Sequence, residues 1–189
     1  MPRFTINANG SLTADDGSAA VFKQIDHQLI HVPHLAPHVI LVPMPRDDVI
    51  GIKVIYLSHC WNESYDPVRH VDAPMLIMDG IRPRVFNIVR FEESRVLPAF
   101  LADLSNHRLY WTPADRNFGV YNATTIIDGL AYTAFFTLKK ERGKLSGIRH
   151  SLVMRVESAY HAPQPSVGQR VKAGAAIDAA LKGKKLKFR

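Results

Sequence analysis

Apolar and polar positions follow one another in short runs along much of the chain, a pattern typical of half-buried strands. In the first part of the chain these runs cover residues 4–7, 20–25, 29–32, 39–42 and 50–57. The last run is the richest in β-branched residues, so we expect it to be a central strand. Residues 58–73 show no period and are expected to form an ordered loop. Short strands are expected over 76–78 and 85–89.

One stretch shows helical spacing instead. Its apolar residues recur at intervals of one, three and four positions: Val96, Leu97, Phe100, Leu101 and Leu104. This pattern predicts a helix with one apolar face. We expect it to begin near residues 94–97, with Pro98 in the first turn, where a missing N–H is harmless, and to end near 105–106.

The clearest strand patterns lie in the second half, over residues 109–111, 131–139 and 148–160. A polar segment with a glycine, residues 140–144, separates the last two, which predicts an antiparallel hairpin. A short helix over about 171–182 and a basic tail follow. The expected fold class is therefore α+β: a mostly antiparallel β-sheet with one packed central helix and a short C-terminal helix.

Charge divides the chain unevenly. The 189 residues are 47% hydrophobic and carry a net charge of +7. Residues 1–80 hold five Lys/Arg and nine Asp/Glu (net −4), whereas residues 81–189 hold nineteen and eight (net +11). This predicts a β-rich acidic N-terminal part, 1–80, and a basic α+β part, 81–189, or one continuous domain over 1–189. The basic half favours a polyanionic partner, RNA above all.

Several classes of protein are excluded by composition. The single cysteine, Cys60, rules out an intrachain disulfide and any multi-cysteine zinc or iron–sulfur site. No apolar run is long enough to span a bilayer, and the N-terminus has no secretory pattern. We therefore expect a cytoplasmic protein without a membrane partner or a cofactor, and the sequence leaves its oligomeric state open.

Two groups of residues offer weak candidates for chemistry. Four histidines fall within twelve residues: His27, His31, His34 and His38. Prolines between them forbid a regular helix, so ordinary loop histidines are favoured over a metal site. Cys60 is a candidate nucleophile with His70 as its base if the loop brings His70 back to it, since the adjacent His59 would point away in a strand; a lone cysteine is more often a small buried apolar residue.

The basic cluster around the predicted hairpin turn is a stronger candidate. Like charges this close repel one another, and a polyphosphate would neutralise them and release counterions. A solubilising loop is the alternative interpretation. A further cation lies among aromatic residues in the segment 110–122, which would suit unpaired bases or simply form core and turn. The expected nucleic-acid-binding residues are Lys139, Lys140, Arg142, Lys144, Arg149 and Arg116.

The predicted strand after this cluster carries candidate catalytic side chains. Alternation places Arg149, Arg155 and Glu157 on one face and His150 on the other. The polar face would be a site floor or a solvated surface, and His150 would be a general acid or base or a histidine capping the core.

The order of elements in residues 92–160, a helix, short strands and a basic hairpin ending in a polar strand, resembles small RNase toxins of the RelE, barnase and EndoU-like class. The resemblance implies a metal-independent endoribonuclease in which the RNA 2′-hydroxyl attacks the neighbouring phosphorus. His150 or Glu157 would exchange protons, and Arg155 and Arg149 would bind the phosphoryl oxygens. Because His150 and Glu157 face opposite ways in a regular strand, a bulge between them would be required.

Two other functions remain open. The same basic surface would serve a non-catalytic nucleic-acid-binding or regulatory module. Alternatively, the acidic front and basic back of the chain would mediate assembly between copies.

Overall fold

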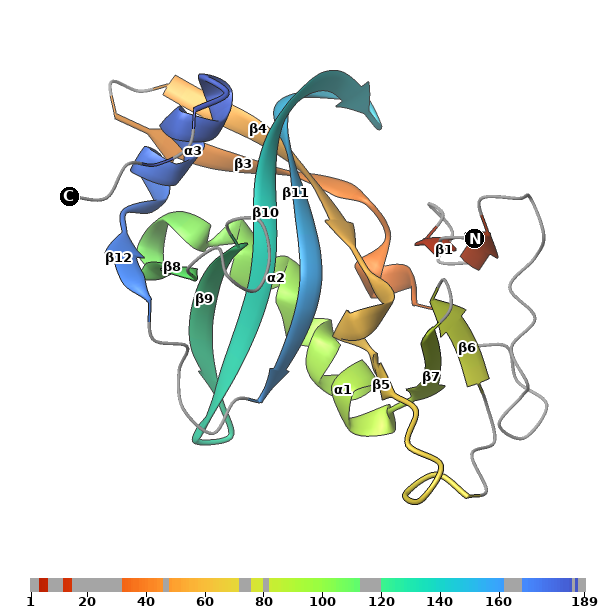
Figure 1. Cartoon of the computed structure of the whole chain (residues 1–189). Helices are drawn as coiled ribbons and strands as arrows, with labels where there is room; N and C mark the ends of the chain where they lie inside the picture. Colours follow the sequence, from red (N-terminus) through yellow and green to blue (C-terminus); the bar gives the residue numbers. More distant parts are fainter. Residues whose placement is uncertain are drawn as a thin grey trace.

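The computed structural model describes residues 4–6, 12–14, 32–45, 48–71, 76–79, 82–112, 120–161, 168–184 and 186. A curled β-sheet with helices on one face dominates this part of the chain (Figure 1). The predicted strands at 20–25 and 29–32 lie outside the described residues, apart from Val32, which is not in a strand.

The main sheet has seven strands in the spatial order β12-β8-β9-β10-β11-β4-β3. Its strands, in chain order, are β3 (His38–Met44), β4 (Asp48–Tyr56), β8 (Leu109–Thr112), β9 (Val120–Ile127), β10 (Leu130–Leu145), β11 (Ile148–His161) and β12 (Gln169–Val171). Neighbours pair antiparallel except β11 and β4, which pair in parallel. The predicted central strand, β4, lies between β11 and β3. Strands from both sides of residue 80 share this sheet, so the charge boundary does not coincide with a boundary of the sheet.

Helices cover one face of the sheet. A continuous helical segment runs through α1 (Ile88–Glu93), the 3₁₀ turn η3 (Ser94–Val96) and α2 (Leu97–Ala102), and the 3₁₀ turn η4 (Leu104–Asn106) follows. The C-terminal helix is α3 (Ala173–Leu181). None of the helices in the described ranges is long and apolar enough to cross a membrane. The predicted α+β fold, with a mostly antiparallel sheet, a packed central helix and a short C-terminal helix, is confirmed.

The central helical segment begins six residues before the earliest predicted start. The Asn87 side chain caps it by accepting a hydrogen bond from the Arg90 N–H at 2.9 Å. Ile88 and Val89, in its first turn, are more than half exposed. The helix therefore begins several residues before its apolar period does, which is why the sequence pattern placed its start too late. The strand predicted over 85–89 ends at Phe86.

Smaller elements lie beside the main sheet. A three-stranded sheet has the order β5-β7-β6, built from β5 (Asn62–Ser64), β7 (Arg82–Phe86) and β6 (Leu76–Asp79). The strands β1 (Phe4–Ile6) and β2 (Leu12–Ala14) pair with each other, and the 3₁₀ turns η1 (Pro33–Leu35) and η2 (Ser58–Cys60) flank β3 and β5. The predicted loop over 58–73 therefore contains a short strand and a 3₁₀ turn.

The core fills the space between the helices and the sheet. Alternate residues of β11 face it, and Leu152, Met154 and Val156 have no exposed surface. Leu97 and Leu101 of α2 and Trp61 pack into the same cluster. Because these residues come from distant parts of the chain, their burial is what joins the two halves.

The long hairpin differs from the predicted one in where it turns. The turn is at Ser146 and Gly147, both with positive φ (47° and 86°), rather than over 140–144. Two residues with positive φ match the twist of a tight hairpin, and a glycine at the second position makes this conformation easy to adopt. Asp128 and Gly129 form a similar turn between β10 and β9, a strand that the sequence pattern missed.

Candidate functional site

The end of the β10–β11 hairpin separates from the strands beside it, with Gly51 of β4 still close against the Arg149 backbone. On one side β9 pairs with β10 only as far as Phe136, and on the other β4 pairs with β11 only from Leu152. Residues 141–150 therefore pair only with each other, and Figure 1 shows this end of the hairpin curling over at the top of the molecule. We call residues 139–150 the basic ribbon.

The basic ribbon carries five exposed cations: Lys139, Lys140, Arg142, Lys144 and Arg149. Lys144 and Arg149 lie directly across from each other in the strand register. The one acid in this segment, Glu141, instead accepts a hydrogen bond from Lys53 at 3.2 Å. Within the described ranges none of the five cations forms an ion pair, so the ribbon presents its positive charge to solvent.

The His150 side chain is buried and is not exposed on the surface of the ribbon. It is only 6% exposed, and its ring lies against Gly143, where a Cβ would approach the imidazole to 2.8 Å. Neither ring nitrogen has a hydrogen-bond partner among the described residues, and the Nε2 atom is 3.8 Å from a Glu141 oxygen. This placement matches a histidine at the edge of the core.

The structure does not bring His150 and Glu157 together. They are seven positions apart in β11, which is roughly 23 Å at about 3.3 Å per residue. A bulge does occur in β11, because Phe135 pairs with Ser158 and Phe136 with Val156, leaving Glu157 as the extra residue. It does not shorten the separation enough for both groups to reach one phosphate.

Arg155 lies between them on the face opposite His150, across from Thr137 of β10. Its Nε atom is buried and has no hydrogen-bond partner in the described part of the chain. The remaining predicted contact, Arg116, lies outside the described residues.

The candidate thiol is inaccessible. Cys60 has no exposed surface, and its thiol donates a hydrogen bond to the Val156 carbonyl at 3.7 Å. Burial is the main reason that its pKa is raised well above the ordinary value. His70 is committed elsewhere, because its Nδ1 accepts from the Asp66 N–H at 2.9 Å and its Nε2 lies 3.3 Å from Glu63.

Glu63 is held ionised by its neighbours. Burial raises its pKa, but hydrogen bonds from Asn87 and His70 and the nearby charge of Arg69 outweigh this effect, so the pKa lies below its usual value. This cluster anchors the loop after β5 to the start of α1, and the ordering of that loop is its evident role.

The histidines that are close together in the sequence do not form a cluster in the described structure. His34 hydrogen-bonds the Ser94 hydroxyl at 2.8 Å, and His38 stacks on Tyr56 with ring centroids 5.8 Å apart. His27 and His31 lie outside the described residues. Among the residues that the structure describes, no three His, Cys, Asp or Glu side chains gather as a metal would require.

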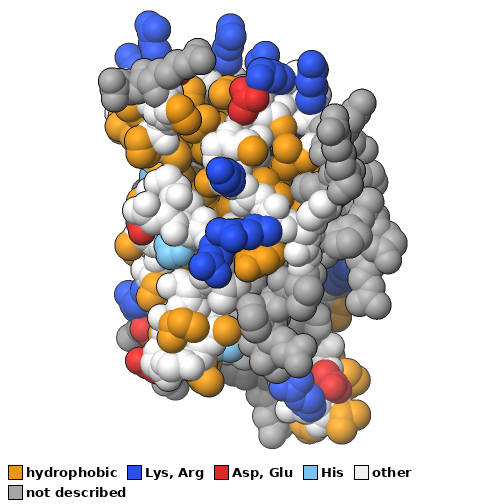
Figure 2. All heavy atoms as spheres, turned by 90° about the vertical axis from the view of Figure 1, so that its left-hand side faces the viewer, with side chains coloured by type: hydrophobic (Ala, Val, Ile, Leu, Met, Phe, Trp, Pro, Cys, Tyr) orange, Lys and Arg blue, Asp and Glu red, His pale blue; other side chains and the backbone are white. Residues whose placement is uncertain are grey.

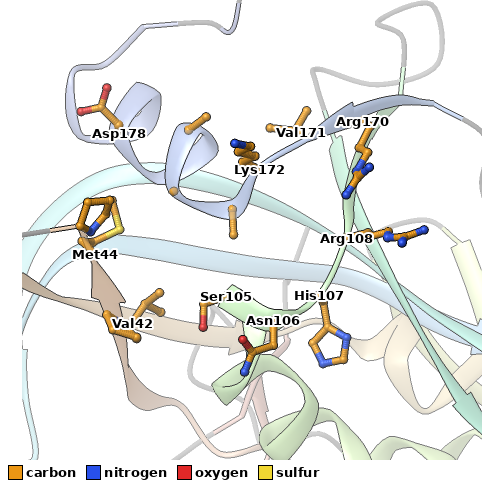
Figure 3. A pocket seen from close by; sticks show the side chains of 15 residues that line it. Val42, Met44, Ser105, Asn106, His107, Arg108, Arg170, Val171, Lys172 and Asp178 are labelled. Carbon is orange, nitrogen blue, oxygen red and sulfur yellow. The ribbon is translucent and has the colours of Figure 1, made fainter.

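A cleft of about 830 Å³ opens where the two edges of the curled sheet approach each other. Residues 42–45, at the end of β3, form one side, and β12 with the first turn of α3 forms the other, while η4 and the two residues after it close the space between them (Figure 3). Figure 2 shows Lys and Arg side chains at the centre of the face that carries α3, β12 and β8, with a histidine beside them.

Three cations line this cleft. Arg170 pairs across from Tyr110, and continuing the same register places Lys172 across from Arg108. Figure 3 shows Arg170 on β12, Lys172 at the start of α3 and Arg108 just before β8. Each is exposed, and none forms an ion pair within the described part of the chain. This is the second place where the fold concentrates positive charge.

A model of the YjaZ family matches residues 22–189. The chain belongs to the YjaZ family. No curated protein and no solved structure matches it. Membership of the YjaZ family does not itself assign an activity to the basic ribbon or to the cleft. The matched residues include both the basic ribbon and the cleft.

The sequence pattern pointed to the ribbon but not to the cleft. Arg108 and Arg170 are far apart in the chain, and β12 is too short to give an alternating pattern. The only available signal was the alternation of charged and apolar residues over 170–172, which is too brief to predict a strand.

Proposed function

We propose that this YjaZ family protein binds nucleic acid through its basic ribbon. The observation that carries the proposal is the basic ribbon, residues 139–150, whose five exposed cations form no ion pair within the described part of the chain. Like charges facing each other, as at Lys144 and Arg149, destabilise an isolated sheet. A polyphosphate would remove that repulsion and release its own counterions.

The shape of the ribbon suits a nucleic-acid groove. A two-stranded β-ribbon fits the major groove of duplex DNA, and residues 142–148 have no third strand paired with them, although Gly51 of β4 lies against the Arg149 backbone at the base of the ribbon. The ribbon contains no Phe, Tyr or Trp to stack on a base, its one aromatic ring, His150, is buried, and its long polar side chains are all cationic apart from Glu141. Contacts to phosphates are therefore favoured, and such contacts position a protein without reading sequence.

Binding without cleavage is the function that the geometry supports better. A ribonuclease needs an acid and a base on either side of one phosphodiester, whereas His150 is buried and lies roughly 23 Å along the strand from Glu157. We therefore expect labelled RNA to keep its length after incubation with the protein, with and without EDTA. Cleavage that persists in EDTA and is lost in Arg155→Ala would revive the ribonuclease hypothesis.

The proposal is tested by fluorescence anisotropy with a labelled duplex DNA and a labelled single-stranded RNA of unrelated sequences. The ribbon variant R142Q/K144Q/R149Q should lose most of its affinity for both, because all three side chains are exposed and make no ion pair in the described structure.

The matched control is R82Q/R95Q/K184Q, which removes the same formal charge at exposed positions outside the ribbon and the cleft. It should bind almost as tightly as the unmodified protein. Equal losses in the two variants would mean that net charge alone drives binding and would overturn the proposal. If the protein does not bind nucleic acid but its molar mass in solution increases with protein concentration, the assembly hypothesis would be favoured instead.

A further inference from the structure

The cleft between β3 and β12 has a cationic side and an apolar side. Arg108, Arg170 and Lys172 line one side. The exposed Pro43 and Pro45 line the other side together with the partly buried Met44, which Figure 3 labels. A ligand that matches both sides must carry a negative charge at one end and a flat or apolar body at the other.

The three cations lie close together without a free carboxylate beside them in the cleft lining. Arg108 and Lys172 directly follow the last pair of the β8–β12 register, Leu109 with Val171, and Arg170 is two positions from Lys172. Like charges in these positions repel each other. The one carboxylate in the lining, Asp178, is bound by Lys182 at 2.6 Å and so offers the cations little compensation. A bound anion would offset this repulsion.

The rest of the lining supplies hydrogen-bonding groups between the two sides. Ser105 and Asn106 are exposed at the edge of η4, and His107 is partly buried beside them. The first turn of α3 also faces the cleft, and no side chain caps its N–H groups. These groups suit the hydroxyls of a sugar and the polar edge of a base.

We propose that this cleft binds a nucleoside phosphate. The phosphates lie against Arg108, Arg170 and Lys172, where arginine guanidinium groups donate paired hydrogen bonds to phosphate oxygens. The base packs on the apolar side formed by residues 43–45. The volume of about 830 Å³ falls within the range of roughly 300–1,000 Å³ that small-molecule sites occupy. The proposal does not depend on nucleic-acid binding by the ribbon.

Isothermal titration calorimetry on the full chain tests this inference with the four common ribonucleoside 5′-diphosphates, adenosine and pyrophosphate. At least one nucleoside diphosphate should bind at least tenfold more tightly than pyrophosphate and more tightly than adenosine. Failure of all four diphosphates to bind would overturn the proposal. Pyrophosphate binding as tightly as the best nucleotide would also overturn it, because the site would then be an anion site without a base subsite.

Two variants assign the binding to the cleft. R170Q/K172Q changes two exposed side chains that are not part of the core, and it should weaken nucleotide binding at least tenfold. The ribbon variant R142Q/K144Q removes the same charge elsewhere and should leave nucleotide binding unchanged. Equal effects of the two variants would place the nucleotide outside the cleft. The cleft and the ribbon are tested with different variants and different ligands. A negative result for nucleotide binding by the cleft therefore does not affect the test of nucleic-acid binding by the ribbon.

Discussion

The salt dependence of binding tests the basic ribbon quantitatively. If its five cations each contact a phosphate of duplex DNA, the slope of log K against log salt is about −0.9 for each contact, or roughly −4.5 in total. Affinity should then fall about 500-fold between 50 and 200 mM salt. The variant R142Q/K144Q/R149Q keeps two of the five cations, so its slope should be about −1.8 and its loss only about 12-fold over the same range.

The measurement is a series of anisotropy titrations at four or more salt concentrations for each protein, with its circular dichroism spectrum as a check on folding. The difference between the two slopes, roughly 2.7, is the deciding quantity, because any contribution from the cleft is common to both proteins. A variant that binds more weakly but keeps the slope of the unmodified protein would refute the reasoning, since its lost side chains could not have been contacting phosphates.

Three further predictions concern stability and reactivity. Gly143→Ala should destabilise the fold by roughly 1–3 kcal/mol in urea denaturation, because the new methyl group meets the His150 ring, and combining it with His150→Ala should cost less than the sum of the two changes. The Cys60 thiol should react with a thiol reagent only in denaturant, since it is fully buried and its pKa is raised; fast reaction of the native protein would contradict its placement. Glu63, whose pKa is lowered by folding, stabilises the protein above its unfolded pKa of about 4.3, and this stability is lost as the pH falls through the folded pKa. Denaturation curves of Glu63→Gln should lack that part of the acid sensitivity, and an unchanged pH profile would show that the carboxylate contributes nothing.

Hydrophobic periodicity predicted the fold class because most strands are buried on one face. Leu152, Met154 and Val156 alternate with Val153 and Arg155, and this is the order that the folded strand uses. The same period placed His150 and Glu157 on opposite faces, and the separation of roughly 23 Å follows from strand geometry alone. The resemblance to a ribonuclease rested on the order of elements, which does not determine these distances.

Local turn chemistry was harder to interpret. Glycines stand at both 143 and 147, and the sequence does not say which one closes the hairpin. The structure uses Ser146 and Gly147 for the turn and gives Gly143 a different purpose, which is to leave room for the His150 ring. The basic residues consequently lie along paired strands rather than in a flexible turn.

The cleft could not have been predicted because it depends on pairings between remote segments. The β8–β12 pairing brings Arg108 and Lys172 to one cleft, and Met44 lines the same cleft because the sheet curls. Curling depends on twist and bulges accumulated over seven strands. No local pattern in the sequence predicts this curling.

The parallel pairing of β4 with β11 has a consequence for how this chain is made. Ile52 and Leu152 are adjacent in the sheet but one hundred residues apart in the sequence. During synthesis at about 5–20 residues per second, the finished β4 must wait roughly 5–20 s for its neighbour to leave the ribosome. Over that interval the apolar edge of the nascent β3–β4 hairpin is unprotected, so chaperone demand and losses to aggregation should be highest before residue 156 has emerged.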